Sequence, residues 1–292
     1  MKPPPFQYHS PTTVAETVGL LTTLDNAMLL AGGQSLMPML NMRYAQPDQV
    51  IDLNHVEGLN GITATDGWLE IGAMTRQRDI ERSDLVKRSC PLLAEAMPLV
   101  GHRQTRNRGT IGGSLSHSDP AAEIAAVCSA ADAIIYVEGP GGGRDIPFVE
   151  FSLGFMTTSL APDEILASIR IPGWENGHGY AFYEFARRHG DFALASAAAL
   201  ITTDDEGLIT RASLTVGGAA PTPVRLTEAE TQLVGEAASP EAFQAAADTC
   251  CTIEAIGDTH APADYRRHLA GVLIKRALET AWTRTAAAGS VA

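Results

Sequence analysis

Apolar and polar positions along the first part of the chain predict a small unit of alternating strands and helices. A helix capped by Ser10 or Thr12 is expected first, because its apolar positions recur at helical spacing. Short apolar runs at 28–31 and 50–53 predict two strands with a second helix between them. We therefore expect a first α/β subdomain over residues 1–57.

A second subdomain is expected over residues 58–173. Its predicted strands are 61–63, 68–71, 133–137 and 164–171. The first two flank Asp66-Gly67, a dipeptide typical of hairpin turns. Thr75 is expected to cap one helix and Pro91 to begin another, whereas the polar stretch 101–109 is interpreted as an irregular loop.

A cluster of helix and strand breakers around Pro172-Gly173 predicts the next domain boundary. Beyond it, strands are expected at 180–185, 193–200 and 208–216, and helices at 227–233, 240–256 and 263–281. Strands followed by helices favour an α+β domain over 174–286. The last six residues, 287–292, are expected to form a flexible tail.

Composition narrows the class of protein. The chain has 292 residues, of which 45% are hydrophobic and 19% charged, as in a globular protein with a substantial core. No apolar stretch approaches the roughly 20 residues that span a bilayer, and no signal peptide is apparent, so a cytoplasmic location without membrane insertion is expected. The net charge of −13 disfavours binding to nucleic acid or to an anionic membrane.

The four cysteines, Cys90, Cys128, Cys250 and Cys251, show no paired spacing. A thiolate cage for zinc or an iron–sulfur cluster is usually marked by such pairs. We therefore expect ordinary buried thiols and no metal centre in this chain.

Two short segments carry the first chemical signal, because each pairs glycines with a small hydroxyl residue. They are Ala31-Gly32-Gly33-Gln34-Ser35 and Thr110-Ile111-Gly112-Gly113-Ser114. Glycine permits a sharp turn and close approach to a ligand, and successive exposed N–H groups form anion-binding concavities. Two such turns suit a diphosphate held from both sides, although each alone more often marks a tight strand–helix turn. Neither matches a Rossmann fingerprint or a P-loop, so the residues alone indicate only a phosphate-bearing cofactor.

The same two segments resemble a known family. Residues 31–36 are similar to the AGG(H/Q)SL motif, and residues 109–114 to the TIGG(N/S) motif, of the FAD-binding medium subunits of molybdenum hydroxylases, the xanthine oxidase and carbon monoxide dehydrogenase family. Asp119-Pro120 and Glu123 follow as they do in that family. Further matches, among them Gly190-Asp191-Phe192-Ala193, extend the resemblance over the whole chain.

The resemblance implies a fold and a set of cofactor contacts. Residues 1–173 are expected to form a vanillyl-alcohol-oxidase (PCMH-type) fold, with FAD between its two α/β subdomains. A C-terminal α+β domain of three strands and three helices should follow. The implied cofactor-binding residues are Leu30, Ala31, Gly32, Gly33, Gln34, Ser35, Leu36, Val100, Gly101, Thr110, Ile111, Gly112, Gly113, Ser114, Asp119, Glu123, Ile165, Leu166, Asp191 and Phe192.

Individual roles follow from the same resemblance. The two glycine segments are implied to hold the FAD diphosphate from opposite sides, and Glu123 to bind the adenosine ribose. Phe192 stands where some relatives carry a tyrosine against the isoalloxazine ring, so it keeps the aromatic face and lacks the hydroxyl. A plain core phenylalanine is the alternative interpretation of Phe192.

The implied function is electron transfer within a larger enzyme. The chain would bind FAD, receive electrons from [2Fe–2S] clusters on a small subunit and pass them to an external acceptor, while substrate is hydroxylated at molybdopterin in a large subunit. A dimer of heterotrimers is expected, with no catalytic side chain and no metal here. The alternatives are a stand-alone flavin oxidoreductase and a non-catalytic assembly module.

Two further stretches have their own interpretations. Residues 116–119, Ser-His-Ser-Asp, contain the residue types of a hydrolytic triad, but neighbours in sequence rarely reach triad geometry. Residues 102–108 form a basic run in an acidic chain. This run is either a solvated loop, a steering element for an anionic cofactor or a contact with a partner subunit.

Overall fold

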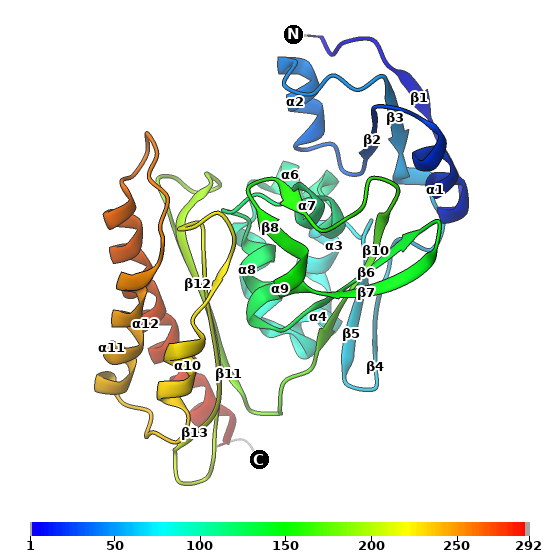
Figure 1. Cartoon of the computed structure of the whole chain (residues 1–292). Coiled ribbons are helices and arrows are strands. Elements are labelled where there is room, and N and C mark those ends of the chain that lie inside the picture. Colours follow the sequence, from blue (N-terminus) through cyan, green and yellow to red (C-terminus); the bar gives the residue numbers. More distant parts are fainter. Residues whose placement is uncertain (1, 290–292) are drawn as a thin grey trace.

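The computed structural model describes residues 2–289. It consists of two subdomains and a C-terminal domain (Figure 1). The first subdomain is a parallel three-stranded sheet in the order β1-β3-β2. Its elements are β1 (Gln7–His9), α1 (Val14–Thr23), β2 (Ala27–Leu30), α2 (Leu36–Met42), β3 (Gln49–Asp52) and the 3₁₀ helix η1 (Leu53–His55). The predicted alternation of strand and helix is thus confirmed.

The cap of α1 differs from the prediction. Thr13, rather than Ser10 or Thr12, accepts a hydrogen bond from the Glu16 amide, and the Glu16 carboxylate accepts one in return from the Thr13 amide. This reciprocal capping box satisfies two amide groups at the helix start.

The second subdomain is a five-stranded sheet in the order β4-β5-β10-β6-β7, and all its pairs are antiparallel. Its strands are β4 (Ile62–Thr65), β5 (Trp68–Gly72), β6 (Ile134–Gly139), β7 (Gly142–Pro147) and β10 (Ile165–Pro172). The Asp66-Gly67 hairpin is confirmed by the antiparallel pairing of β4 with β5. Its helices are α3 (Gln77–Arg82), α4 (Asp84–Ser89), α5 (Pro91–Ala96), η2 (Met97–Leu99), α6 (Arg103–Arg108), α7 (Ile111–His117), α8 (Glu123–Ala130) and α9 (Phe148–Phe151), and a small hairpin adds β8 (Ser152–Gly154) and β9 (Thr157–Thr158).

Two local predictions in this subdomain are wrong. Thr75 caps no helix, because its hydroxyl donates to the Gly61 carbonyl and accepts from the Gly61 amide instead. The expected loop at 101–109 contains helix α6, which is polar on all sides. Its Arg106 side chain, which donates to the carbonyls of Val100 and Gly101, supplies the tertiary support that a polar helix needs.

The C-terminal domain has three long antiparallel strands, as predicted, and a fourth strand of two residues. The strands are β11 (Gly179–Ala186), β12 (Ala193–Thr203), β13 (Ile209–Gly217) and β14 (Val224–Arg225), in that order in the sheet. Three helices cover them: α10 (Thr227–Leu233), α11 (Pro240–Asp248), followed by η3 (Thr249–Thr252), and α12 (Ala263–Gly289). Helix α12 continues to Gly289 and so includes the first three residues of the tail expected from 287, whereas 290–292 lie outside the described residues.

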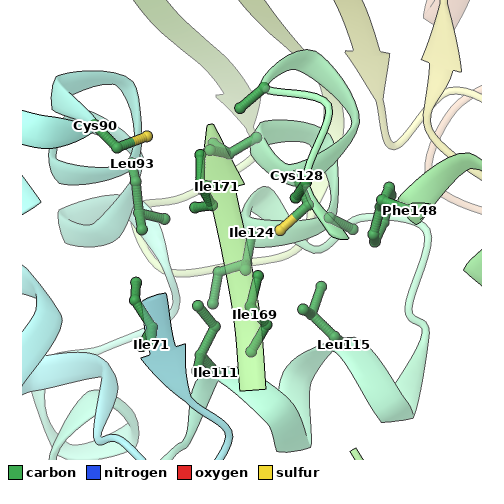
Figure 2. Packing of buried hydrophobic residues seen from close by; sticks show 14 of the residues in the cluster. Ile71, Cys90, Leu93, Ile111, Leu115, Ile124, Cys128, Phe148, Ile169 and Ile171 are labelled. Atoms are coloured by element: carbon green, nitrogen blue, oxygen red, sulfur yellow. The ribbon is translucent and has the colours of Figure 1, made fainter. Parts of the chain in front are cut away.

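The main core joins the second subdomain to the C-terminal domain. Strand β10 runs through it, with Ile169 and Ile171 packed among residues of α5, α7 and α8 (Figure 2). Phe182, Ala198 and Leu200 of the C-terminal sheet belong to the same buried cluster. The two domains therefore share one continuous apolar core.

A smaller cluster attaches the first subdomain to the second. Leu53, Val56 and Leu59 follow β3 and pack with Ile165 and Ala167 of β10. Strand β10 bulges between Leu166 and Ser168, and the carbonyl of the unpaired Ala167 accepts a hydrogen bond from the Ala73 amide. Ile165 and Leu166 are consecutive strand residues, so they point to opposite faces of β10 and enter different apolar clusters. Because of the bulge, Leu166 and Ile169 lie in the same cluster although they are three residues apart.

Candidate functional site

The two glycine segments meet at the junction of the two subdomains. A Cβ atom on Gly32 would lie 2.3 Å from the Arg108 carbonyl oxygen and 2.8 Å from the Gly109 Cα atom. A Cβ atom on Gly113 would lie 3.3 Å from the Ala31 Cβ atom. The structure therefore brings together two segments that are nearly 80 residues apart in sequence. Only glycine at position 32 permits this backbone contact.

The first segment presents a row of unused amide groups. Within residues 2–289, the N–H groups of Gly32, Gly33, Gln34 and Ser35 have no protein acceptor. Gly33 has a φ of +71°, which turns successive amides toward one side. The Ser35 hydroxyl makes no capping bond to α2, and only the Gln34 side chain folds back, onto the Gly32 carbonyl. Leu30 and Leu36, at the ends of β2 and α2, flank this row and are half-buried.

The second segment differs from the expected turn, because Gly112, Gly113 and Ser114 lie inside helix α7. Its amides are occupied: Gly112 donates to the Ala73 carbonyl at 2.9 Å, and Gly113 donates to the Thr110 hydroxyl at 3.1 Å. A Cβ atom on Gly112 would lie 2.5 Å from the Ala73 Cβ atom, so this glycine serves close packing. Ile111 is fully buried and anchors the helix. What this segment can offer a ligand is hydroxyl groups, those of Thr110 and half-buried Ser114.

A bridge of polar side chains ties the two segments together. The Arg76 guanidinium donates to the Arg108 carbonyl at 2.6 Å and to the Asn54 side-chain oxygen at 2.5 Å. Asn54 in turn donates to the Ala31 carbonyl at 3.1 Å. Burial and the nearby Arg108 lower the pKa of Arg76, although an arginine stays charged. A fixed positive charge therefore lies beside the free amides of the first segment.

Asp119 and Glu123 have separate environments. Asp119 lies in the turn before α8, where its carboxylate accepts a hydrogen bond from the Ala121 amide at 2.9 Å. Glu123 is buried at the first turn of α8 and lies against Glu184 of β11. Burial raises the pKa of Glu123 to about 7, and burial together with Glu123 raises the pKa of Glu184 to about 8. One proton is therefore retained by this carboxyl pair at neutral pH.

Val100 and Leu166 belong to the main core, whereas Ile165 belongs to the smaller cluster against which Ala31 packs. Val100 and Gly101 precede α6, and Gly101 has a φ of +48° that brings the chain into that helix. Ile165 and Leu166 are both buried. The positions of Ile165 and Leu166 in two apolar clusters agree with a packing role. Their contact with a cofactor stays a prediction.

Asp191 and Phe192 lie in the loop between β11 and β12. Phe192 is 75% exposed, so the alternative of a plain core phenylalanine is wrong. Asp191 pairs with Arg187 at 3.5 Å. A Cβ atom on the preceding Gly190 would lie 2.3 Å from the His102 ring, which places this loop against the start of α6. The structure thus gathers a third segment, from the C-terminal domain, at the same junction.

The residues missed by sequence reasoning are Asn54, Arg76 and Glu184. Each acts through a contact with a residue that is distant in sequence. None of the three lies in a glycine segment or in a periodic apolar pattern that would mark it in the sequence.

Other candidate chemistry is not supported within residues 2–289. The Ser118 hydroxyl lies close to the carbonyls of Gly154 and Thr157, not to His117, so the 116–119 stretch forms no triad. No group of three or more His, Cys, Asp or Glu side chains there is arranged to hold a metal. Cys90, Cys128 and Cys250 are buried as predicted, whereas Cys251 is exposed, contrary to expectation. No helix of that range has the length and apolar character to cross a membrane.

Comparison with known proteins places two family matches on the chain. Residues 4–174 match the FAD binding domain in molybdopterin dehydrogenase, and residues 180–281 match the CO dehydrogenase flavoprotein C-terminal domain. The chain is 40% identical over 288 residues to the carbon monoxide dehydrogenase medium chain of Hydrogenophaga pseudoflava, covering 98% of this chain and 100% of that one. It is 39% identical to the nicotine 6-hydroxylase medium subunit of Paenarthrobacter nicotinovorans, covering 98% and 100%.

The same similarity extends to three dimensions. A solved chain of Hydrogenophaga pseudoflava carbon monoxide dehydrogenase superposes with a TM-score of 0.94 at 41% identity, covering 97% of this chain and 99% of that one. The mixed α+β architecture and the full-length agreement between the two chains leave no domain of this chain unmatched.

Proposed function

The chain belongs to the family of FAD-binding medium subunits of molybdenum hydroxylases, and from this premise we propose that it transfers electrons between [2Fe–2S] clusters and an external acceptor. The clusters and a molybdopterin centre would reside on a small and a large partner subunit, in a dimer of heterotrimers. Relatives named as medium subunits or medium chains support such an assembly. The substrate of the complex would be a small molecule such as an N-heterocycle, a purine, an aldehyde or CO. A cytoplasmic location stays a prediction.

The observation that carries this proposal is the contact of the two glycine segments beside four unused amides. A diphosphate needs hydrogen-bond donors and positive charge, and Gly32 to Ser35 provide the donors while Arg76 provides the charge. The Thr110 and Ser114 hydroxyls lie on the other side of the junction. These residues fit an FAD diphosphate chemically, and the second segment contributes hydroxyls rather than the backbone amides first expected.

Other predicted residues would bind the ribose and the isoalloxazine ring of FAD. Glu123 would accept hydrogen bonds from the ribose hydroxyls. The proton that Glu123 and Glu184 share would leave the pair with acceptor oxygens for these hydroxyls. Exposed Phe192 would cover the isoalloxazine ring and limit its contact with water. FAD, when bound, supplies the redox chemistry, and the protein supplies binding, orientation and electrostatics.

Purification from the native source tests the function directly. We expect yellow protein with FAD, molybdenum and iron in the preparation, together with two co-purifying polypeptides. A colourless chain that is active alone would refute the proposal. A yellow chain that oxidises substrate without partners would identify it as a stand-alone flavin oxidoreductase.

Glycine substitutions test the cofactor site itself. Gly32→Val and Gly112→Val should each abolish FAD retention, because a side chain at either position collides with backbone. Gly19→Ala is the matched control, since no atom lies within 4 Å of a Cβ atom there. Flavin content is measured from the absorbance of released FAD per protein chain. Full flavin content in both valine variants would contradict the site.

A further inference from the structure

Five arginines gather beside the candidate FAD site and have no role in it so far. Arg78 and Arg82 lie on α3, Arg103 begins α6, and Arg187 and Arg188 lie in the loop after β11. We call these five residues the arginine patch. Arg103 belongs to the basic run at 102–108, in a chain of net charge −13.

Most of this positive charge is not neutralised. Among residues 2–289, Arg78, Arg82, Arg103 and Arg188 have no carboxylate within ion-pair distance. Glu81 pairs with Arg106, and Asp191 pairs with Arg187. Asp79 is the other carboxylate on α3. Desolvation and the neighbouring Arg82 and Arg103 lower the pKa of Arg78.

The patch is continuous across two domains. The Gly190 backbone lies directly against the His102 ring, and the His102 and His189 rings are 6.3 Å apart. This contact places the arginines of the β11–β12 loop next to those of α3 and α6. Phe192, which is 75% exposed, follows in the same loop. The loop that carries Arg187 and Arg188 therefore also carries an exposed aromatic ring.

The surface is suited to a protein rather than to a small molecule. Two cavities of the described chain lie away from the patch, one beside Trp68 and Trp174 and one between α11 and α12. Arginine and aromatic residues are enriched at the energetically important positions of protein interfaces. The spread of these arginines over three elements gives the patch the character of a protein interface.

We propose that the arginine patch docks an acidic face of the [2Fe–2S] subunit, an inference that rests on the proposed function. A protein that exchanges electrons with the flavin must bind close to it, because electron transfer weakens steeply with distance. The chain as a whole is strongly negative and repels an acidic partner, so a cluster of unpaired arginines attracts that partner locally and orients the encounter. Arg76 and Arg108 are assigned to the cofactor site and are not part of the docking surface.

A charge-reversal experiment tests this docking surface. The variant Arg82→Glu/Arg103→Glu is compared with Arg88→Glu/Arg276→Glu, whose arginines are also exposed and without an ion-pair partner among the described residues. Each FAD-loaded full chain is bound to the immobilised [2Fe–2S] subunit at about 50 mM and about 500 mM salt. We expect the patch variant to bind at least about tenfold more weakly at low salt, the control to bind like wild type, and the difference to shrink at high salt.

Each other outcome has a defined meaning. Equal binding of the patch variant and the control would overturn the proposal. Unchanged binding with a raised KM for an anionic electron acceptor would assign the patch to a small anion and would also overturn it. Loss of FAD from the patch variant would show that these arginines belong to the cofactor site. A wild-type chain without FAD would refute the proposed function itself, which the flavin spectrum shows before any binding is measured.

Discussion

At the scale of single residues, the carboxyl pair Glu123–Glu184 is expected to make the stability of the fold depend on pH. Both pKa values are raised above the ordinary value of 4.5, to about 7 and about 8. A carboxyl whose pKa is raised by folding holds its proton while the unfolded chain has lost it. Its contribution to stability is therefore complete below about pH 4.5 and is lost as the pH rises through the raised values.

Glu184→Gln should remove most of this pH dependence. In the FAD-free chain we expect the variant to gain stability over wild type as the pH rises, by on the order of 1 kcal/mol at about pH 8.5 and little at about pH 4.5. Urea unfolding at the two pH values measures the difference. Glu57→Gln, at an exposed glutamate, serves as control. An equal effect at both pH values would mean that the two carboxyls do not share a proton.

At the scale of elements, the Arg76 bridge joins the end of β3 to the segment before α7. Arg76→Lys keeps the charge and loses the planar fork that reaches Asn54 and the Arg108 carbonyl together. We expect the Kd for FAD to rise about tenfold, or about 1.4 kcal/mol, measured by flavin fluorescence during rebinding to the FAD-free chain. Arg88→Lys, at an exposed arginine, should leave the Kd unchanged. A wild-type Kd in Arg76→Lys would show that the bridge does not organise the site.

The elements also show what could be predicted from the sequence. The long strands β10 to β13 and the hairpin at Asp66-Gly67 were predictable, because apolar runs and turn residues have local signatures. Helix α6 was not, since it has no apolar face and depends on contacts of Arg106 with Val100, Gly101 and Glu81.

The candidate site divides in the same way. The two glycine segments were visible as motifs, and their resemblance to a family gave them a ligand. The side chains that join them were not visible. Arg76 meets Asn54 and Arg108, and Glu184 meets Glu123, only after three segments have folded together. Such pairings leave no periodic pattern in one sequence.

At the scale of the whole molecule, the shared core predicts that the FAD-binding region is not an independent folding unit. Phe182, Ala198 and Leu200 of the C-terminal sheet cover apolar residues of α5 and α8. A chain ending at residue 173 would expose that face. We expect it to bind an apolar fluorescent dye strongly and to self-associate, whereas the full chain does neither. A monomeric, dye-free fragment would contradict the shared core.

The contact of Gly32 with Arg108 and Gly109 has a consequence for the rate at which the cofactor is exchanged. This contact closes the junction between the two subdomains, and a diphosphate seated on the adjacent amides would be held by both. Its departure would then require a local opening of the small β1-β3-β2 subdomain, in which the short cluster around Leu53 and Ile165 separates. Cofactor loss and amide hydrogen exchange in β2 and β3 should consequently share one opening step, and the amide exchange should slow when FAD is bound.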